Sequence, residues 1–90
     1  MQEVKNVRLK LLGEHLDTAM SFEEVGNVCL KMDNFEEAIR SFRKASEFRL
    51  NLLGDHLDTA RSYDLLGTAQ IGKHDFSDAL ESLNTALRIK

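Results

Sequence analysis

The side chains best suited to metal chemistry are two pairs, His15 with Asp17 and His56 with Asp58. Imidazole nitrogens and carboxylate oxygens are both common zinc ligands. The second pair repeats the first 41 residues later, inside the same sequence context. Equivalent loops one repeat apart need not converge on one ion. The repetition therefore favours a structural role, such as capping the helix that follows each histidine. We expect no metal site, and we expect His74 to be a simple turn residue.

No catalytic constellation accompanies these pairs. Cys29 could act as a nucleophile only beside a base, which its sequence context does not supply. Glu23 and Glu24 form a carboxylate pair, but such pairs are too common on helices to indicate acid–base catalysis. The sequence has no glycine-rich phosphate loop, no His-Glu-x-x-His motif and no Gly-x-Ser-x-Gly motif. We predict that the chain is not an enzyme and uses no cofactor.

The composition argues against several classes of partner. The 90 residues carry a formal net charge of −3, whereas phosphate-binding surfaces need clustered positive potential. Arg40, Arg43 and Lys44 do cluster, but the acidic residues beside them indicate a solvated helix face. No apolar run approaches the roughly 20 residues that span a membrane, and the N-terminus has no signal-peptide core. Cys29 is the single cysteine, so no internal disulfide can form. We expect a cytoplasmic protein that binds neither nucleic acid nor membrane.

The side chains discussed above lie within an internal sequence repeat, which determines the elements that position them. The segment 11–19 recurs as 52–60, and later positions keep the same offset of 41 residues without gaps. Pairing residues 8–49 with 49–90 gives 16 identities in 42 pairs, where chance would give only about 2 or 3. Most of the other pairs are conservative replacements. The chain is therefore built from two similar units.

Each unit has the pattern of two helices. Apolar residues recur at helical spacing, no stretch alternates with period two, and we predict an all-α fold without strands. Asn34, with Glu37 three residues later, predicts a capping box at the start of one helix. Gly54 predicts a left-handed residue that closes it. Gly26 and Gly67 are expected to let a neighbouring helix approach closely. Five helices are predicted, with approximate spans of 2–12, 16–31, 35–52, 57–71 and 75–89.

These positions resemble the signature of the tetratricopeptide repeat, in which small and large residues alternate at fixed spacing. The first unit offers Phe22, Val25, Gly26, Phe35, Ala38, Phe42 and Ala45. The second offers Tyr63, Leu66, Gly67, Phe76, Ala79, Leu83 and Ala86. The long period and the His-x-Asp-Thr-Ala opening are similar to the kinesin-light-chain and nephrocystin type. The resemblance implies one α-solenoid domain of antiparallel helix pairs over 1–90. Residues 1–12 would be the trailing helix of a preceding unit, 13–53 repeat 1 and 54–90 repeat 2.

The resemblance also implies a function, which is the binding of a protein or peptide along a concave groove lined by the first helix of each unit. Asn27 matches a position where the family uses Asn to bond a peptide backbone. Leu16 and Leu57 depart from the family, which commonly has proline there. Another variant of the family binds a C-terminal carboxylate with Lys and Asn residues. This sequence departs from that variant, because Glu23 stands where a basic residue would be wanted and Leu65 replaces a common Asn. The implied groove residues are Met20, Glu23, Glu24, Asn27, Leu30, Lys31, Arg61, Asp64, Leu65, Thr68 and Ile71.

Two alternatives to groove binding stay open on the sequence. In the first, these groove residues are ordinary solvated helix positions that bind nothing. In the second, the chain is a self-assembling scaffold, either a homo-oligomer or a helix-swapped dimer. Two units are few for a stable solenoid, and exposed apolar patches at the ends of an array are normally covered. The end residues expected to be exposed are Val4, Val7, Leu11, Leu83 and Leu87.

Overall fold

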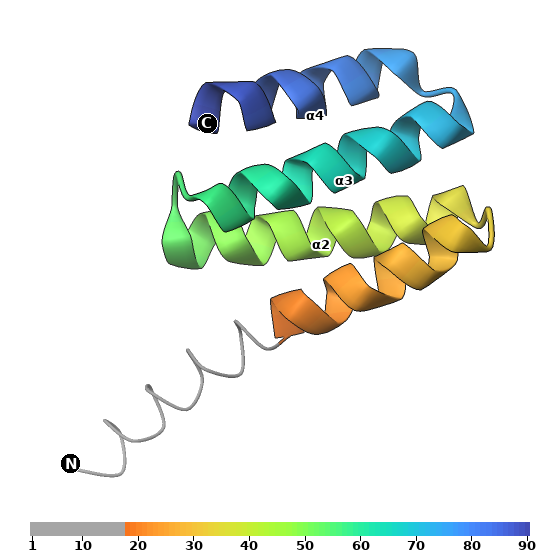
Figure 1. Ribbon diagram of the computed structural model, residues 1–90, viewed down its shortest axis with the longest axis horizontal. Helices are drawn as coiled ribbons and strands as arrows, with labels where there is room; N and C mark the ends of the chain where they lie inside the picture. The colour runs from red at the N-terminus through yellow and green to blue at the C-terminus, as the bar shows by residue number, and fades with distance from the viewer. Residues whose placement is uncertain (1–17) are drawn as a thin grey trace, which may run out of the picture.

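The structure, a computed structural model, describes residues 18–90, which form four helices joined by short turns (Figure 1). The first runs over residues 18–31 and is followed by α2 (Phe35–Leu53), α3 (Leu57–Lys73) and α4 (Phe76–Ile89). Successive helices run antiparallel, and no strand occurs within the described range. The all-α prediction is confirmed. Five helices were predicted and the described residues hold four, because the segment 2–12 lies outside them.

The two turns within the units have the same geometry at equivalent positions. In each, one residue has a left-handed backbone, and the N–H of the next residue donates to the carbonyl five residues back. These hydrogen bonds run from Asn34 to Cys29 and from Asp75 to Gln70, both at 2.8 Å. The left-handed residues are Asp33, with φ of 60°, and His74, with φ of 73°. The prediction that His74 is a turn residue is confirmed.

The predicted capping box at the start of α2 is wrong. Asn34 does precede the helix, but its side chain makes no capping hydrogen bond. An N-cap side chain reaches the first turn when its backbone is extended. The ψ of Asn34 is instead 74°. The Glu37 carboxylate does not accept from the Asn34 N–H, as a capping box requires. Its Oε1 instead lies 3.4 Å from Nη1 of Arg40 on the exposed surface.

The connection between α2 and α3 confirms two predictions about single residues. Gly54 follows α2 with φ of 65° and ψ of −139°, a combination that residues with a side chain rarely adopt, and its N–H donates to Leu50 at 2.9 Å. His56 caps α3, because its Nδ1 accepts the Asp58 N–H at 3.1 Å. The structural role predicted for His56 is confirmed, whereas His15 lies outside the described residues.

The core is centred on α2 and α3. Its buried residues are Ala38, Ile39, Phe42, Leu66 and Ala69, with Cys29, Leu30, Tyr63 and Leu65 partly buried around them. Figure 1 shows α3 between α2 and α4, and α3 packs against both. Cys29 is thus half-buried against the core.

Two glycines set the distance between the helices of each unit. A Cβ built at Gly26 would lie 2.6 Å from the ring of Phe42, and one at Gly67 would lie 2.8 Å from Leu83. Both predicted close approaches are therefore confirmed. Leu83, predicted to be exposed, is half-buried because it packs over Gly67. Leu87 is 67% exposed, as predicted.

Thr59 in the first turn of α3 is fully buried, and its hydroxyl has no hydrogen-bond partner among residues 18–90. A buried hydroxyl without a partner costs free energy, and valine has nearly the same shape. Thr59→Val should therefore raise the free energy of unfolding by about 1 kcal/mol, which corresponds to a melting temperature higher by about 4–8 °C. Thermal denaturation followed by circular dichroism measures this. Thr68→Val, at an exposed position, is the control, and a lower melting temperature for Thr59→Val would contradict the prediction.

Candidate partner-binding groove

Two adjoining hollows, of about 370 Å³ and 160 Å³, lie between the helix over 18–31 and α3. They share Met20, Arg49 and Arg61 and so form one continuous surface, which we call the groove. The helix over 18–31 supplies one wall, α3 and the turn before it supply the other, and the end of α2 closes it. The lining residues are Met20, Glu23, Glu24, Asn27, Arg49, Leu53, His56, Asp58 and Arg61.

Glu23 lies at the bottom of the groove and is only 5% exposed. Its carboxylate forms ion pairs with Arg49 and with Nε of Arg61, the latter at 3.2 Å. A buried carboxylate needs such partners, because removing a charge from water is costly. The sequence placed Glu23 among the groove residues, and in the structure it holds two arginines in position.

Arg49, from α2, joins three helices and was not among the predicted groove residues. Its Nη1 donates to Glu23, to the Ser62 hydroxyl at 2.9 Å and to the Asp58 carbonyl at 3.3 Å. The side chain is buried, with 7% of the residue exposed. Arg49 therefore connects the first unit to the first helix of the second unit.

A signal for this ion pair was present in the sequence. Glu23 and Asp64 occupy equivalent positions, and so do Arg49 and Lys90, because each pair of positions differs by 41. In the second unit, Lys90 Nζ lies 2.6 Å from Asp64 Oδ2 and forms the corresponding bridge. Opposite charges that recur together at the repeat offset would have indicated the contact.

The structure brings together five of the eleven predicted groove residues, which are Met20, Glu23, Glu24, Asn27 and Arg61. Met20 is 54% exposed, the Arg61 side chain is 67% exposed, and Asn27 is half-buried. Glu24 is exposed beside them, with Glu23 below. Apolar surface, an amide and a positioned guanidinium thus share one groove.

The other six predicted groove residues do not line the groove. Lys31 is exposed beyond its end. Asp64 is paired with Lys90, and Thr68 donates its hydroxyl to the Asp64 carbonyl at 3.0 Å. Leu65 packs against the core. Leu30 also packs against the core, and Ile71 is 45% exposed.

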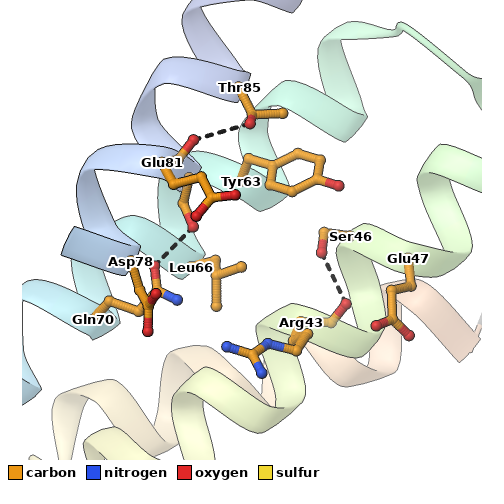
Figure 2. A pocket seen from close by; sticks show the side chains of 10 residues that line it. Arg43, Ser46, Glu47, Tyr63, Leu66, Gln70, Asp78, Glu81 and Thr85 are labelled. Carbon is orange, nitrogen blue, oxygen red and sulfur yellow. Dashed lines mark hydrogen bonds between the residues drawn. The ribbon is translucent and has the colours of Figure 1, made fainter. Parts of the chain in front are cut away.

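A separate hollow of about 300 Å³ lies between α2 and α4, over α3 (Figure 2). The serine and threonine hydroxyl groups that line it already have partners within the protein. Ser82 donates to Gln70 Oε1 at 2.7 Å, and Ser46 and Thr85 donate to carbonyls of their own helices. In Figure 2 the Ser46 hydroxyl points at the Arg43 carbonyl, and the Thr85 hydroxyl points at the Glu81 carbonyl. The groove, where an exposed guanidinium and an amide meet apolar surface, is the better candidate site.

Within residues 18–90, no group of three or more His, Cys, Asp or Glu side chains is placed to hold a metal ion. None of the helices described there is long and apolar enough to cross a membrane.

Comparison with known proteins identifies the family. The tetratricopeptide repeat model matches residues 17–90, which is most of the chain. Neither the curated proteins nor the solved structures gave a significant match. Tetratricopeptide repeats are generally non-enzymatic modules that bind proteins or peptides. The helix pairs, the close approaches at Gly26 and Gly67 and the family match lead to one conclusion: the chain belongs to the tetratricopeptide repeat family.

Proposed function

We propose that the groove receives a peptide segment or a helix of a partner protein. The observation that carries the proposal is the convergence of Met20, Glu24, Asn27 and Arg61, from two helices, around a buried ion pair. Binding sites for peptides combine apolar surface with a few placed polar groups.

The groove offers three kinds of contact to such a segment. Met20 and Leu53 provide apolar surface for a side chain of the partner. The Asn27 amide both donates and accepts, which suits a peptide backbone. Arg61 is held at Nε by Glu23 while most of its side chain remains exposed. Fixing the guanidinium before binding reduces the entropy that association costs.

The charges of the groove favour an internal segment of the partner over a terminal carboxylate. Glu23, Glu24 and Asp58 contribute three carboxylates, against the two guanidinium groups of Arg49 and Arg61. Glu23 already neutralises part of both arginines. A negatively charged chain end would meet net repulsion here. We also infer, from the period of 41 residues, that the chain falls within the long-period kinesin-light-chain and nephrocystin-like subtype.

A test begins with a peptide array or a pull-down, followed by isothermal titration of each recovered partner. Asn27→Ala and Arg61→Gln should each weaken binding by about tenfold, because each removes a hydrogen-bonding group worth about 1.4 kcal/mol. Lys31→Ala and Thr68→Ala are the matched controls, since both residues lie on first helices but outside the groove. Unchanged affinity of every partner for both groove variants would refute the proposal.

A further inference from the structure

The hollow between α2 and α4 lies on a different surface from the groove, since no residue lines both. Its serine and threonine hydroxyls are bonded within the protein, but its charged groups are not. Glu47 of α2, with Asp78 and Glu81 of α4, makes no ion pair within residues 18–90. Against these three carboxylates, the described lining of the hollow has one basic residue, Arg43. The hollow therefore carries an excess of negative charge that the described part of the chain does not compensate.

The Gln70 side chain lies on the wall of this hollow with one of its two polar atoms unused. Gln70 is only 2% exposed, and its Oε1 accepts the Ser82 hydroxyl at 2.7 Å. Its Nε2 makes no hydrogen bond to any group among residues 18–90. Figure 2 shows this nitrogen between Asp78 and Leu66. A buried amide nitrogen without a partner costs free energy, so the hollow offers a donor to an incoming acceptor such as a main-chain carbonyl.

The repeat shows that helix packing does not require these polar groups. At the offset of 41 residues, Gln70 stands where the first unit has Cys29, and Tyr63 stands where it has Phe22. The two units are otherwise closely similar along these helices. A thiol and a phenyl ring serve the first unit at these positions, so packing alone does not account for an amide and a hydroxyl in the second. Binding of a ligand would account for both.

The Tyr63 end of the hollow has the groups that bind a guanidinium. In Figure 2 the Tyr63 ring lies between Glu81 on the α4 side and Glu47 on the α2 side. A guanidinium is planar, stacks on aromatic rings and bonds carboxylates with two donors at once. The Tyr63 hydroxyl has no hydrogen-bond partner in the described part of the chain and is a further acceptor. Arg43 does not occupy this end, because Figure 2 shows its side chain directed away from Glu47.

The two ends of the hollow are spaced for one arginine residue. Tyr63 and Gln70 both lie on α3, seven positions apart, and seven residues of helix rise about 10 Å. An extended arginine covers about this distance from its own carbonyl oxygen to its guanidinium. We propose that the hollow binds an arginine side chain of a partner protein. The guanidinium lies against the Tyr63 ring between Glu47 and Glu81, and the arginine carbonyl accepts from Nε2 of Gln70.

Repeats added at either end of the chain would leave this site open. The units of a solenoid stack along one direction, and each contacts only its neighbours. Figure 1 shows the described helices stacked in this way. An additional unit would pack on the helix over 18–31 or on α4, and so would lie beside the hollow and not over it.

Titration of the isotope-labelled 90-residue chain with N-acetyl-arginine amide, followed by NMR, tests the proposal. Backbone amide signals around Tyr63 and Gln70 should shift, and affinity should fall as salt is added, because the charges are near the surface. The citrulline analogue has the same shape without the charge and should not bind measurably. The lysine analogue should bind more weakly than the arginine probe, because an ammonium cannot bond a carboxylate with two parallel donors.

Variants of the hollow show which groups bind the probe. Glu47→Gln and Glu81→Gln should each weaken binding of N-acetyl-arginine amide by about tenfold, because each removes a charge-assisted hydrogen bond. Both residues are exposed, so both variants should fold, which circular dichroism checks. Asp55→Asn makes the same change of charge at an exposed position outside the hollow and the groove, and should leave affinity unchanged. Glu24→Gln, in the groove, should also leave it unchanged.

Three results would overturn the proposal. The first is equal affinity for the arginine probe and for either analogue. The second is a set of signal shifts confined to the groove. The third is wild-type affinity in both Glu47→Gln and Glu81→Gln. None of these results bears on partner binding in the groove, because the two sites share no residue.

Discussion

Arg49→Met should destabilise the protein by about 3–5 kcal/mol. The substitution leaves the Glu23 carboxylate buried, with Arg61 as its remaining partner at 3.2 Å. It also removes the hydrogen bonds to Ser62 and to the Asp58 carbonyl. A small domain has a total stability of about 5–15 kcal/mol, so the variant is expected to be partly unfolded at moderate temperature. Urea denaturation followed by circular dichroism measures the loss.

Two further variants show that burial causes this effect. Glu23→Leu combined with Arg49→Met removes both charges and should recover most of the lost stability. Lys90→Ala breaks the equivalent bridge to Asp64. The Lys90 side chain is 48% exposed and the Asp64 side chain is 38% exposed. An exposed bridge contributes less than about 1 kcal/mol, so this variant should be nearly neutral. If Arg49→Met cost no more than Lys90→Ala, the buried pair would not support the fold as we describe.

Phe42→Ala should cost about 3–5 kcal/mol of unfolding free energy. Phe42 is fully buried, lies within the core cluster and covers Gly26. Loss of its ring leaves a cavity that the surrounding helices fill only partly. Chemical denaturation gives the magnitude. Phe42→Leu, which copies the pairing of Leu83 with Gly67 in the second unit, should cost clearly less.

A double-mutant cycle tests the contact between Phe42 and Gly26 directly. Gly26→Ala alone should destabilise by about 1–3 kcal/mol, because its Cβ would stand 2.6 Å from the ring. In the Phe42→Ala background the obstruction is gone, and the higher helix propensity of alanine should make the same substitution neutral or stabilising by up to about 1 kcal/mol. Additive effects would contradict the close approach.

The sequence predicted the helices well because their determinants are local. The third predicted helix, 35–52, is observed as Phe35–Leu53, and the last, 75–89, as Phe76–Ile89. The close approach at Gly26 was also predictable, since the repeat carries the same glycine at position 67. The capping box was not, because side-chain capping depends on the ψ angle of Asn34, which the motif does not specify.

The groove was predicted only in part, for a reason that lies in the geometry of the repeat. Asn27 faces a wall that α3 supplies, so the groove exists at that position. Thr68 is its equivalent on α3, but neither the groove nor the hollow between α2 and α4 includes it. Arg49 was missed because its contact with Glu23 joins residues 26 positions apart. The spacing of residues within one helix cannot reveal such a pair, and only the comparison of the two units at the offset of 41 residues would have indicated it.

The stacking of α3 between α2 and α4 has a consequence for how the chain folds. The main packing among these three helices joins neighbours along the chain, α2 with α3 and α3 with α4. Such local contacts close only short loops, so little chain entropy is lost before they form. We expect folding on the microsecond-to-millisecond scale typical of helical proteins with low contact order. The same locality allows α4, which among residues 18–90 packs mainly against α3, to open and close while α2 and α3 remain together.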